Sequence, residues 1–294
     1  MEITINTPRE FNFKRTALSH GWYDLLPFEF DKETWSVIRV LDAGLVQPVT
    51  ATITATGRKL RINVPAKNLS QRVTEKITRD VRHIFRLDDD LSEFYGRMKD
   101  DSDFAWVAST GSGRLLRSPT VFEDLVKTIC TTNCSWALTD KMVKGLVQNL
   151  GVKTKDGRCS FPTPEAMAKE SVDFYKDVIR AGYRAPYFKE LAEKVAAGEL
   201  NVESWLNTDL PTKELMREMK KVKGVGPYAA EHMLRMLGRY DGLALDSWVR
   251  ATFAKKHNSG KACPDKKIEK HYDRFGPWRG LALWCDMTQD WHED

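Results

Sequence analysis

The spacing of apolar residues changes along the chain. In the first hundred residues apolar and polar positions alternate in short runs, which predicts strands at 51–56 and 60–64. The residues between them, 57–59, are typical of a turn. A helix is predicted to begin after Ser70, a suitable N-cap, and to end near Phe85.

From residue 115 onward the apolar residues follow helical spacing instead. One such helix is marked by Phe122, Leu125, Val126, Ile129 and Cys130. Further helices are predicted at 162–169, 171–180, 187–197 and 213–221. We therefore expect an α+β fold, with a small antiparallel β domain at 1–105 and a mostly α-helical body at 106–294.

A Gly-rich hairpin is expected at 219–228, where Lys223-Gly224-Val225-Gly226 leads into Pro227. Glycine allows a tight turn and a close approach by another molecule, and proline suits the first position of a helix. The start of that helix presents unpaired N–H groups and partial positive charge. The hairpin therefore favours an anion, above all a phosphate.

Asp246 follows an apolar run twenty residues after the hairpin. Together these features resemble the helix–hairpin–helix DNA glycosylase superfamily, whose signature is this hairpin, a Gly/Pro-rich loop and an aspartate. Three other stretches resemble its 8-oxoguanine and alkylpurine branches in the same order: 114–135, 182–187 and 275–282. The alternative for this segment is a structural helix–turn–helix, with Asp246 as an ordinary N-cap.

The resemblance assigns a role to each part of the expected DNA surface. Asn133 is the wedge that fills the gap left by an extruded base, and Tyr183 lines the same groove. The alternatives are a helix-end role for Asn133 and core packing for Tyr183. The phosphate-binding set is Lys221, Lys223, Gly224, Val225 and Gly226. The same hairpin is expected to hold Na⁺ or K⁺ through the backbone carbonyls of Lys220, Val222 and Val225.

An extruded base needs an aromatic pocket, because stacking holds it in place. The expected pocket residues are Trp248, Trp22, Tyr23, Tyr228 and Leu283. Bifunctional relatives carry a Schiff-base lysine at the position of Tyr228, which implies a monofunctional enzyme here. Leu283 stands where 8-oxoguanine enzymes place a glutamine, which favours alkylated purines.

Asp246 would stabilise the charge that develops on the sugar or deprotonate the attacking water. The resulting prediction is a monofunctional glycosylase that excises damaged, alkylated purines by base flipping. An 8-oxoguanine or mismatch glycosylase and a non-catalytic DNA-binding protein are the alternatives. No cofactor is expected for catalysis.

Composition agrees with this prediction without deciding it. The net charge of +5 suits a nucleic-acid partner, which we expect to be double-stranded DNA containing a damaged base. The cysteines, five and scattered, predict no disulfide framework, and only Cys263 and Cys285 lie where some relatives carry an iron–sulfur cluster, so no cluster is expected. The polar N-terminus indicates no signal peptide or membrane span, so an intracellular location is expected. The protein is also expected to be a monomer.

Overall fold

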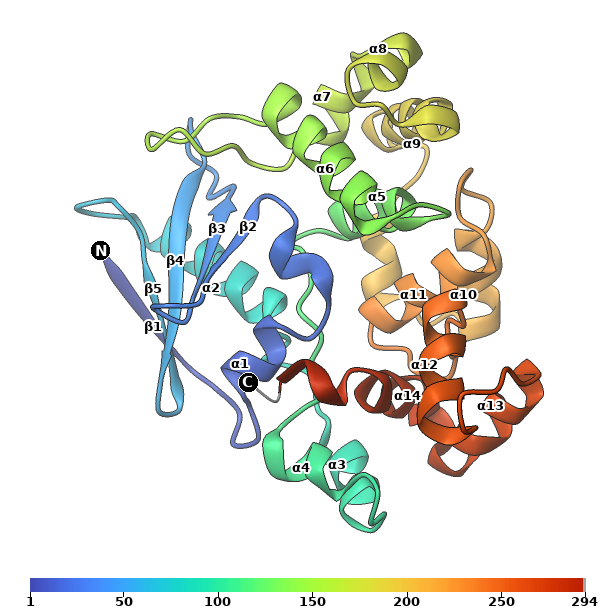
Figure 1. The fold of residues 1–294 in the computed structure, drawn as a ribbon. Helices are drawn as coiled ribbons and strands as arrows, with labels where there is room; N and C mark the ends of the chain where they lie inside the picture. Colours follow the sequence, from blue (N-terminus) through green and yellow to red (C-terminus); the bar gives the residue numbers. More distant parts are fainter. Residues whose placement is uncertain (293–294) are drawn as a thin grey trace.

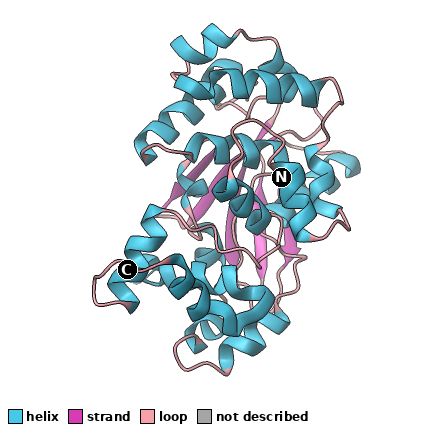
Figure 2. Cartoon of the chain, turned by 90° about the vertical axis from the view of Figure 1, so that its right-hand side faces the viewer, coloured by secondary structure: helices cyan, strands magenta, loops and turns pink. Residues whose placement is uncertain are grey.

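The computed structural model describes residues 1–292 and confirms the predicted α+β fold (Figure 1). Its described part contains a five-stranded antiparallel sheet with the order β1-β5-β4-β3-β2. The strands are β1 (Glu2–Asn6), β2 (Phe28–Asp31), β3 (Ser36–Leu41), β4 (Val49–Thr56) and β5 (Lys59–Asn63). In the view turned by 90°, helices lie above and below the strands (Figure 2).

The β4–β5 hairpin confirms the two predicted strands. Ile53 pairs with Ile62, and both side chains are buried, whereas Arg61 next in line is exposed. Alternate residues therefore face the core, as the alternating sequence requires. Gly57 makes the turn with φ +58, a conformation that glycine adopts without steric cost.

Helices make up most of the remaining chain. Ser70 caps α2 (Gln71–Ile84) by accepting a hydrogen bond from the Val73 amide at 3.4 Å, as predicted. The other α-helices are α1 (Phe13–Ala17), α3 (Ser92–Lys99), α4 (Ala105–Thr110), α5 (Val121–Thr131), α6 (Trp136–Leu150), α7 (Pro164–Ala168), α8 (Val172–Asp177), α9 (Ala185–Ala196), α10 (Thr212–Met219), α11 (Pro227–Met236), α12 (Ser247–His257), α13 (Asp265–Tyr272) and α14 (Arg279–Met287). Within residues 1–292, no helix has both the length and the apolar character needed to cross a membrane.

The hydrophobic core does not divide at residue 105. One apolar cluster runs from the sheet through α5 and α6 to α11. A second cluster joins α3 and α4 to α12, α13 and α14. Phe94 and Phe104, which lie within the expected β domain, therefore pack with the C-terminal helices, because their apolar faces are buried there rather than on the sheet.

A buried charge cluster joins the sheet to α5. Arg39 on β3 donates to Glu123 at 2.6 Å, and Lys127 lies 2.8 Å from the other oxygen of that carboxylate. All three side chains are almost inaccessible to solvent. Burial alone would raise the pKa of Glu123, but Arg39 and Lys127 outweigh it and hold the pKa below its ordinary value.

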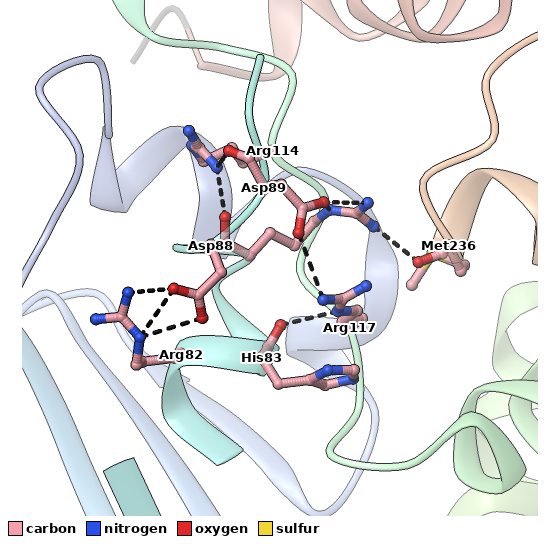
Figure 3. A network of polar contacts seen from close by, with 8 residues as sticks. Arg82, His83, Asp88, Asp89, Arg114, Arg117 and Met236 are labelled. Carbon is pink, nitrogen blue, oxygen red and sulfur yellow. Dashed lines mark hydrogen bonds and ion pairs between the residues drawn. The ribbon is translucent and has the colours of Figure 1, made fainter. Parts of the chain in front are cut away.

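A second polar network ties the segment after α2 to the end of α11 (Figure 3). Arg86 contacts the Asp89 carboxylate through Nε at 2.7 Å and donates through Nη1 to the Met236 carbonyl at 2.7 Å. Arg117 lies 3.6 Å from the same carboxylate. Because Arg86 is fully buried, this contact fixes α11 against the N-terminal half.

Replacing Glu123 by Gln should destabilise the protein by about 3–5 kcal/mol, because two buried cations lose their counter-ion. The matched control is Glu93→Gln, which breaks an exposed pair with Arg97 and should cost under about 1 kcal/mol. Denaturant unfolding measures both. Equal effects of the two substitutions would show that the buried cluster does not stabilise the docking of the sheet.

Candidate DNA-binding and base-excision site

A cleft of about 1460 Å³ lies where four distant segments meet. These are the 3-10 turn Gly21–Asp24, the residues after α5, the hairpin before α11 and the start of α12. The cleft is lined by nearly all of the predicted site residues: Trp22, Tyr23, Asn133, Tyr183, Lys220, Lys221, Val222, Lys223, Gly224, Val225, Gly226, Tyr228, Asp246 and Trp248. Residues that the sequence assigned to one site therefore lie around one cleft in the fold.

The hairpin between α10 and α11 uses its two glycines differently. Gly224 has φ +88, and a Cβ there would lie 2.8 Å from Cδ2 of Tyr187, so glycine is required by the protein itself. Gly226 is the N-cap residue of α11, and a Cβ there would meet no atom within 4 Å. The first amides of α11 therefore face an open approach.

Asp246 is both an N-cap and part of the cleft. Its Oδ1 accepts a hydrogen bond from the Val249 amide at 2.7 Å, which holds the carboxylate at the start of α12. Burial and the negative charge of the neighbouring Asp246 raise the pKa of Tyr228 to about 12. The capping role and a catalytic role are thus compatible in one residue.

The turn after α5 presents Asn133 to solvent. Asn133 has φ +47, a left-handed conformation that asparagine tolerates, and its amide lies 3.4 Å from the Tyr183 hydroxyl. The buried Arg184 holds this turn by donating to the carbonyls of Ile129 and Thr132. The sequence prediction missed Arg184 as the residue that positions the turn.

Trp22 forms an inner wall of the cleft rather than an exposed stacking platform. Only 2% of its surface is exposed, and its indole N–H donates to Asp124 at 2.7 Å. Its ring packs against two histidines, His20 at 4.8 Å and His232 at 5.4 Å between centroids. Both histidines line the cleft and were missed in the sequence because they are remote from each other and follow no motif.

The prediction that Leu283 lines the pocket is wrong. Leu283 is fully buried in the second apolar cluster, whereas its neighbour Trp284 lines the cleft. Successive residues of a helix point about 100° apart, so a shift of one position moves a side chain from the core to the cleft. The aromatic wall continues from Trp284 to Trp248 and Trp291, with ring centroids 5.9 Å away in both cases.

Comparison with known proteins agrees with this geometry. The family description "HhH-GPD superfamily base excision DNA repair protein" matches residues 126–277, about half of the chain, and includes both the turn at Asn133 and Asp246.

The chain belongs to the HhH-GPD superfamily.

Two curated relatives match part of this chain. The Saccharomyces cerevisiae N-glycosylase/DNA lyase is 28% identical over 171 residues, which are 54% of this chain and 46% of that protein. The Bacillus subtilis DNA-3-methyladenine glycosylase is 25% identical over 170 residues, 56% of this chain and 55% of that protein. This HhH-GPD chain therefore spans about half the length of these relatives.

Solved structures share the fold over nearly the whole chain. The 3-methyladenine DNA-glycosylase from Archaeoglobus fulgidus superposes with a TM-score of 0.78 at 20% identity and covers 99% of both chains. The Clostridium acetobutylicum 8-oxoguanine glycosylase/lyase gives 0.76 at 20% identity, over 97% of this chain and 95% of that one. The fold shared with these two proteins thus includes the N-terminal sheet.

The lysines on the hairpin of this HhH-GPD protein have acidic partners. Lys223 lies 2.5 Å from Glu190, and Lys221 lies 2.6 Å from Glu218. Both ammonium groups are more than half exposed. Neither is buried beside Asp246, where a reactive amine would need to lie.

One cluster of possible metal ligands lies outside the cleft. His257, His271 and Asp286 bring ligand atoms within 4.8 Å of one another, although their sequence spacing did not indicate a site. Lys256 lies 2.9 Å from one Asp286 oxygen, and the Tyr272 hydroxyl donates to the other at 2.5 Å. The carboxylate is thus already neutralised by a cation, which argues against a divalent metal.

His20 should stay uncharged at pH 5. Burial and nearby cations lower the pKa of His20 to about 4, although the hydrogen bond to the Leu116 carbonyl opposes this shift. Because this lies below the ordinary value of 6.5, His20 contributes stability above pH 6.5 that is lost as the pH falls toward 4. Long-range ¹H–¹⁵N NMR at pH 5 should show a neutral ring, and an imidazolium signal would contradict the burial.

Proposed function

We propose that this protein is a monofunctional DNA glycosylase that excises damaged purines, above all alkylated ones, from double-stranded DNA. The observation that carries the proposal is the position of Asp246. Its carboxylate lies in an aromatic-lined cleft beside a hairpin that presents open backbone amides. These are the parts needed to hold an extruded nucleotide by its phosphate, its base and its sugar.

The DNA would bind across the hairpin and the turn after α5. The amides at the start of α11 are suited to a phosphate, since Gly226 leaves space for close approach. Asn133 is exposed, also lines the cleft and would enter the duplex as the wedge. Lys221 and Lys223 would exchange their surface glutamates for the DNA backbone, since exposed ion pairs are weak.

The chemistry would be hydrolysis of the bond between the base and C1′ of the sugar. The bonding electron pair leaves with the base, and positive charge develops on the sugar beside the Asp246 carboxylate. Water then adds to C1′, and its proton passes to the carboxylate or to solvent. Tyr228 holds the place of the Schiff-base lysine and supplies no amine, so the strand would remain intact at the abasic site.

The preference for alkylated purines is supported by the aromatic wall. Alkylation leaves a purine positively charged, and a cation over the face of a tryptophan is stabilised by the ring quadrupole. Trp248, 38% exposed, offers such a face in the cleft that holds Asp246, whereas the Trp284 ring beside it already has the Arg235 guanidinium 4.9 Å from its centroid. Leu283 does not support a preference for alkylated purines, because its side chain does not reach the cleft.

We also propose a monovalent cation at the hairpin, held by the carbonyls of Lys220, Val222 and Val225. All three residues line the cleft at the hairpin. The Val222 carbonyl already accepts from the Val225 amide at 3.1 Å, so it would use its second lone pair for the ion. Such an ion would stiffen the turn that presents the amides to a phosphate.

Asp246→Asn should abolish base release while preserving binding to lesion-bearing DNA. The amide keeps the N-cap hydrogen bond but lacks the charge, so we expect a loss of about 100-fold or more. The rate of base release is measured in single-turnover assays on duplexes that contain 3-methyladenine, 7-methylguanine, hypoxanthine, 8-oxoguanine or mismatched thymine.

In the same assay the wild-type protein should leave strands that break only after alkali or heat, and borohydride should trap no adduct. Near-normal release by Asp246→Asn would reduce that residue to a helix cap. A trapped adduct would overturn the monofunctional assignment, and no release from any lesion would favour a non-catalytic DNA-binding protein.

Gly226→Ala should weaken DNA binding without affecting the fold. The backbone at Gly226 has φ −84, which alanine adopts freely, and the added methyl group meets no protein atom. The methyl group would instead block the phosphate. The control is Gly96→Ala, an equally open glycine in α3, which should leave the dissociation constant unchanged. Unaltered DNA affinity of Gly226→Ala would remove the hairpin from the interface.

A further inference from the structure

The tautomer of His20 is fixed by the backbone. Its Nε2 is hydrogen-bonded to the carbonyl oxygen of Leu116, and a carbonyl can only accept, so Nε2 carries the hydrogen. In the neutral ring Nδ1 is then a bare acceptor. This atom is buried and has no hydrogen-bond partner among the described residues, although His20 lines the cleft.

His232 also has a buried ring nitrogen without a hydrogen-bond partner among the described residues. It lies on α11, two turns from the hairpin glycines, and is only 8% exposed. The nitrogen without a partner is Nε2. The two imidazole centroids are 6.3 Å apart, and Tyr228 stacks on the outer face of the His232 ring at 6.2 Å.

Two unpartnered ring nitrogens at one end of a cleft are unusual, because nearly all buried polar atoms in proteins have a partner. No carboxylate orients His20 for acid–base chemistry: its Nε2–H donates to the Leu116 carbonyl, and the nearby Asp124 accepts from the Trp22 indole instead. Burial lowers the pKa of both rings, and positive charges add to it: Lys127, Arg235 and Arg86 for His20, and Arg235 for His232. Both rings are therefore kept neutral.

We infer that His20 and His232 read the edge of the extruded base, with His20 Nδ1 accepting a hydrogen bond from an N–H group of that base. This inference rests on the proposed function and adds the residues that contact the base edge. Trp22 packs against both rings, and Tyr228 stacks on His232.

The chemical consequence is that the extruded base must turn a donor toward His20. A purine that carries an amino group or a ring N–H can satisfy the His20 acceptor; 7-methylguanine, 3-methyladenine, hypoxanthine and 8-oxoguanine all do. A base without such a group leaves the acceptor buried and unpaired.

The test uses His20→Phe and His232→Phe, which keep an aromatic ring and remove the nitrogens. The control is His83→Phe, a histidine of α2 that lies outside the cleft and whose pKa burial lowers to about 3. Two measurements are compared for each protein: the single-turnover rate of base release from lesion duplexes, and the dissociation constant for a duplex with a tetrahydrofuran abasic site. The second substrate has no base to read.

Each pocket variant should release 7-methylguanine and hypoxanthine about 10- to 100-fold more slowly, the size expected for one lost buried hydrogen bond. Its affinity for the tetrahydrofuran duplex should stay within about twofold of the wild type, which a merely structural role would not predict. His83→Phe should change neither quantity. If His20→Phe does not fold, because Leu116 loses its donor, His232→Phe alone decides the question.

Wild-type rates in the folded pocket variants, on every lesion, would overturn this inference and leave the proposed function standing. Equal loss of abasic-site binding and of base release would also overturn it, since the rings would then only support the fold. A wild-type protein that releases no base would overturn both.

Discussion

The cleft depends on the docking of the N-terminal sheet against helix α5. Glu123 holds Arg39 of the sheet and Lys127 of its own helix in a dry interface. Next to it along the helix, Asp124 accepts from the Trp22 indole, and burial raises the pKa of Asp124 to about 6. These adjacent carboxylates therefore fix the loop that carries His20 and Trp22 opposite the hairpin. Without that docking, the cleft would lack an inner wall.

The other wall is encoded locally. Gly224 is required by its positive φ and by contact with Tyr187, Pro227 starts α11, and Asp246 caps α12. Each of these is a short-range requirement, so each residue type can be recognised in the sequence. Arg86 then joins the far end of α11 to the N-terminal half through the Met236 carbonyl (Figure 3). The local hairpin and the distant loop thus meet in a single rigid arrangement.

This difference explains what sequence reasoning could predict. The strands at 51–56 and 60–64, the helix after Ser70 and the hairpin all follow from periodicity and turn chemistry, and the structure contains them. The error at Leu283 came from assigning a helix face one residue out of phase. His20 and His232 are 212 positions apart and meet only through tertiary packing, which no local pattern reports.

The central claim is that the cleft receives an extruded purine, with its edge toward the histidines and its sugar beside Asp246. A crystal structure of the protein with a duplex containing a 2′-fluorinated, uncleavable lesion nucleotide tests this directly. The account predicts the base inside the cleft, an N–H of that base within hydrogen-bond distance of His20 Nδ1, and a phosphate at Gly226. A lesion base that remains stacked in the duplex, or one that enters the cleft with no contact to His20, would contradict it.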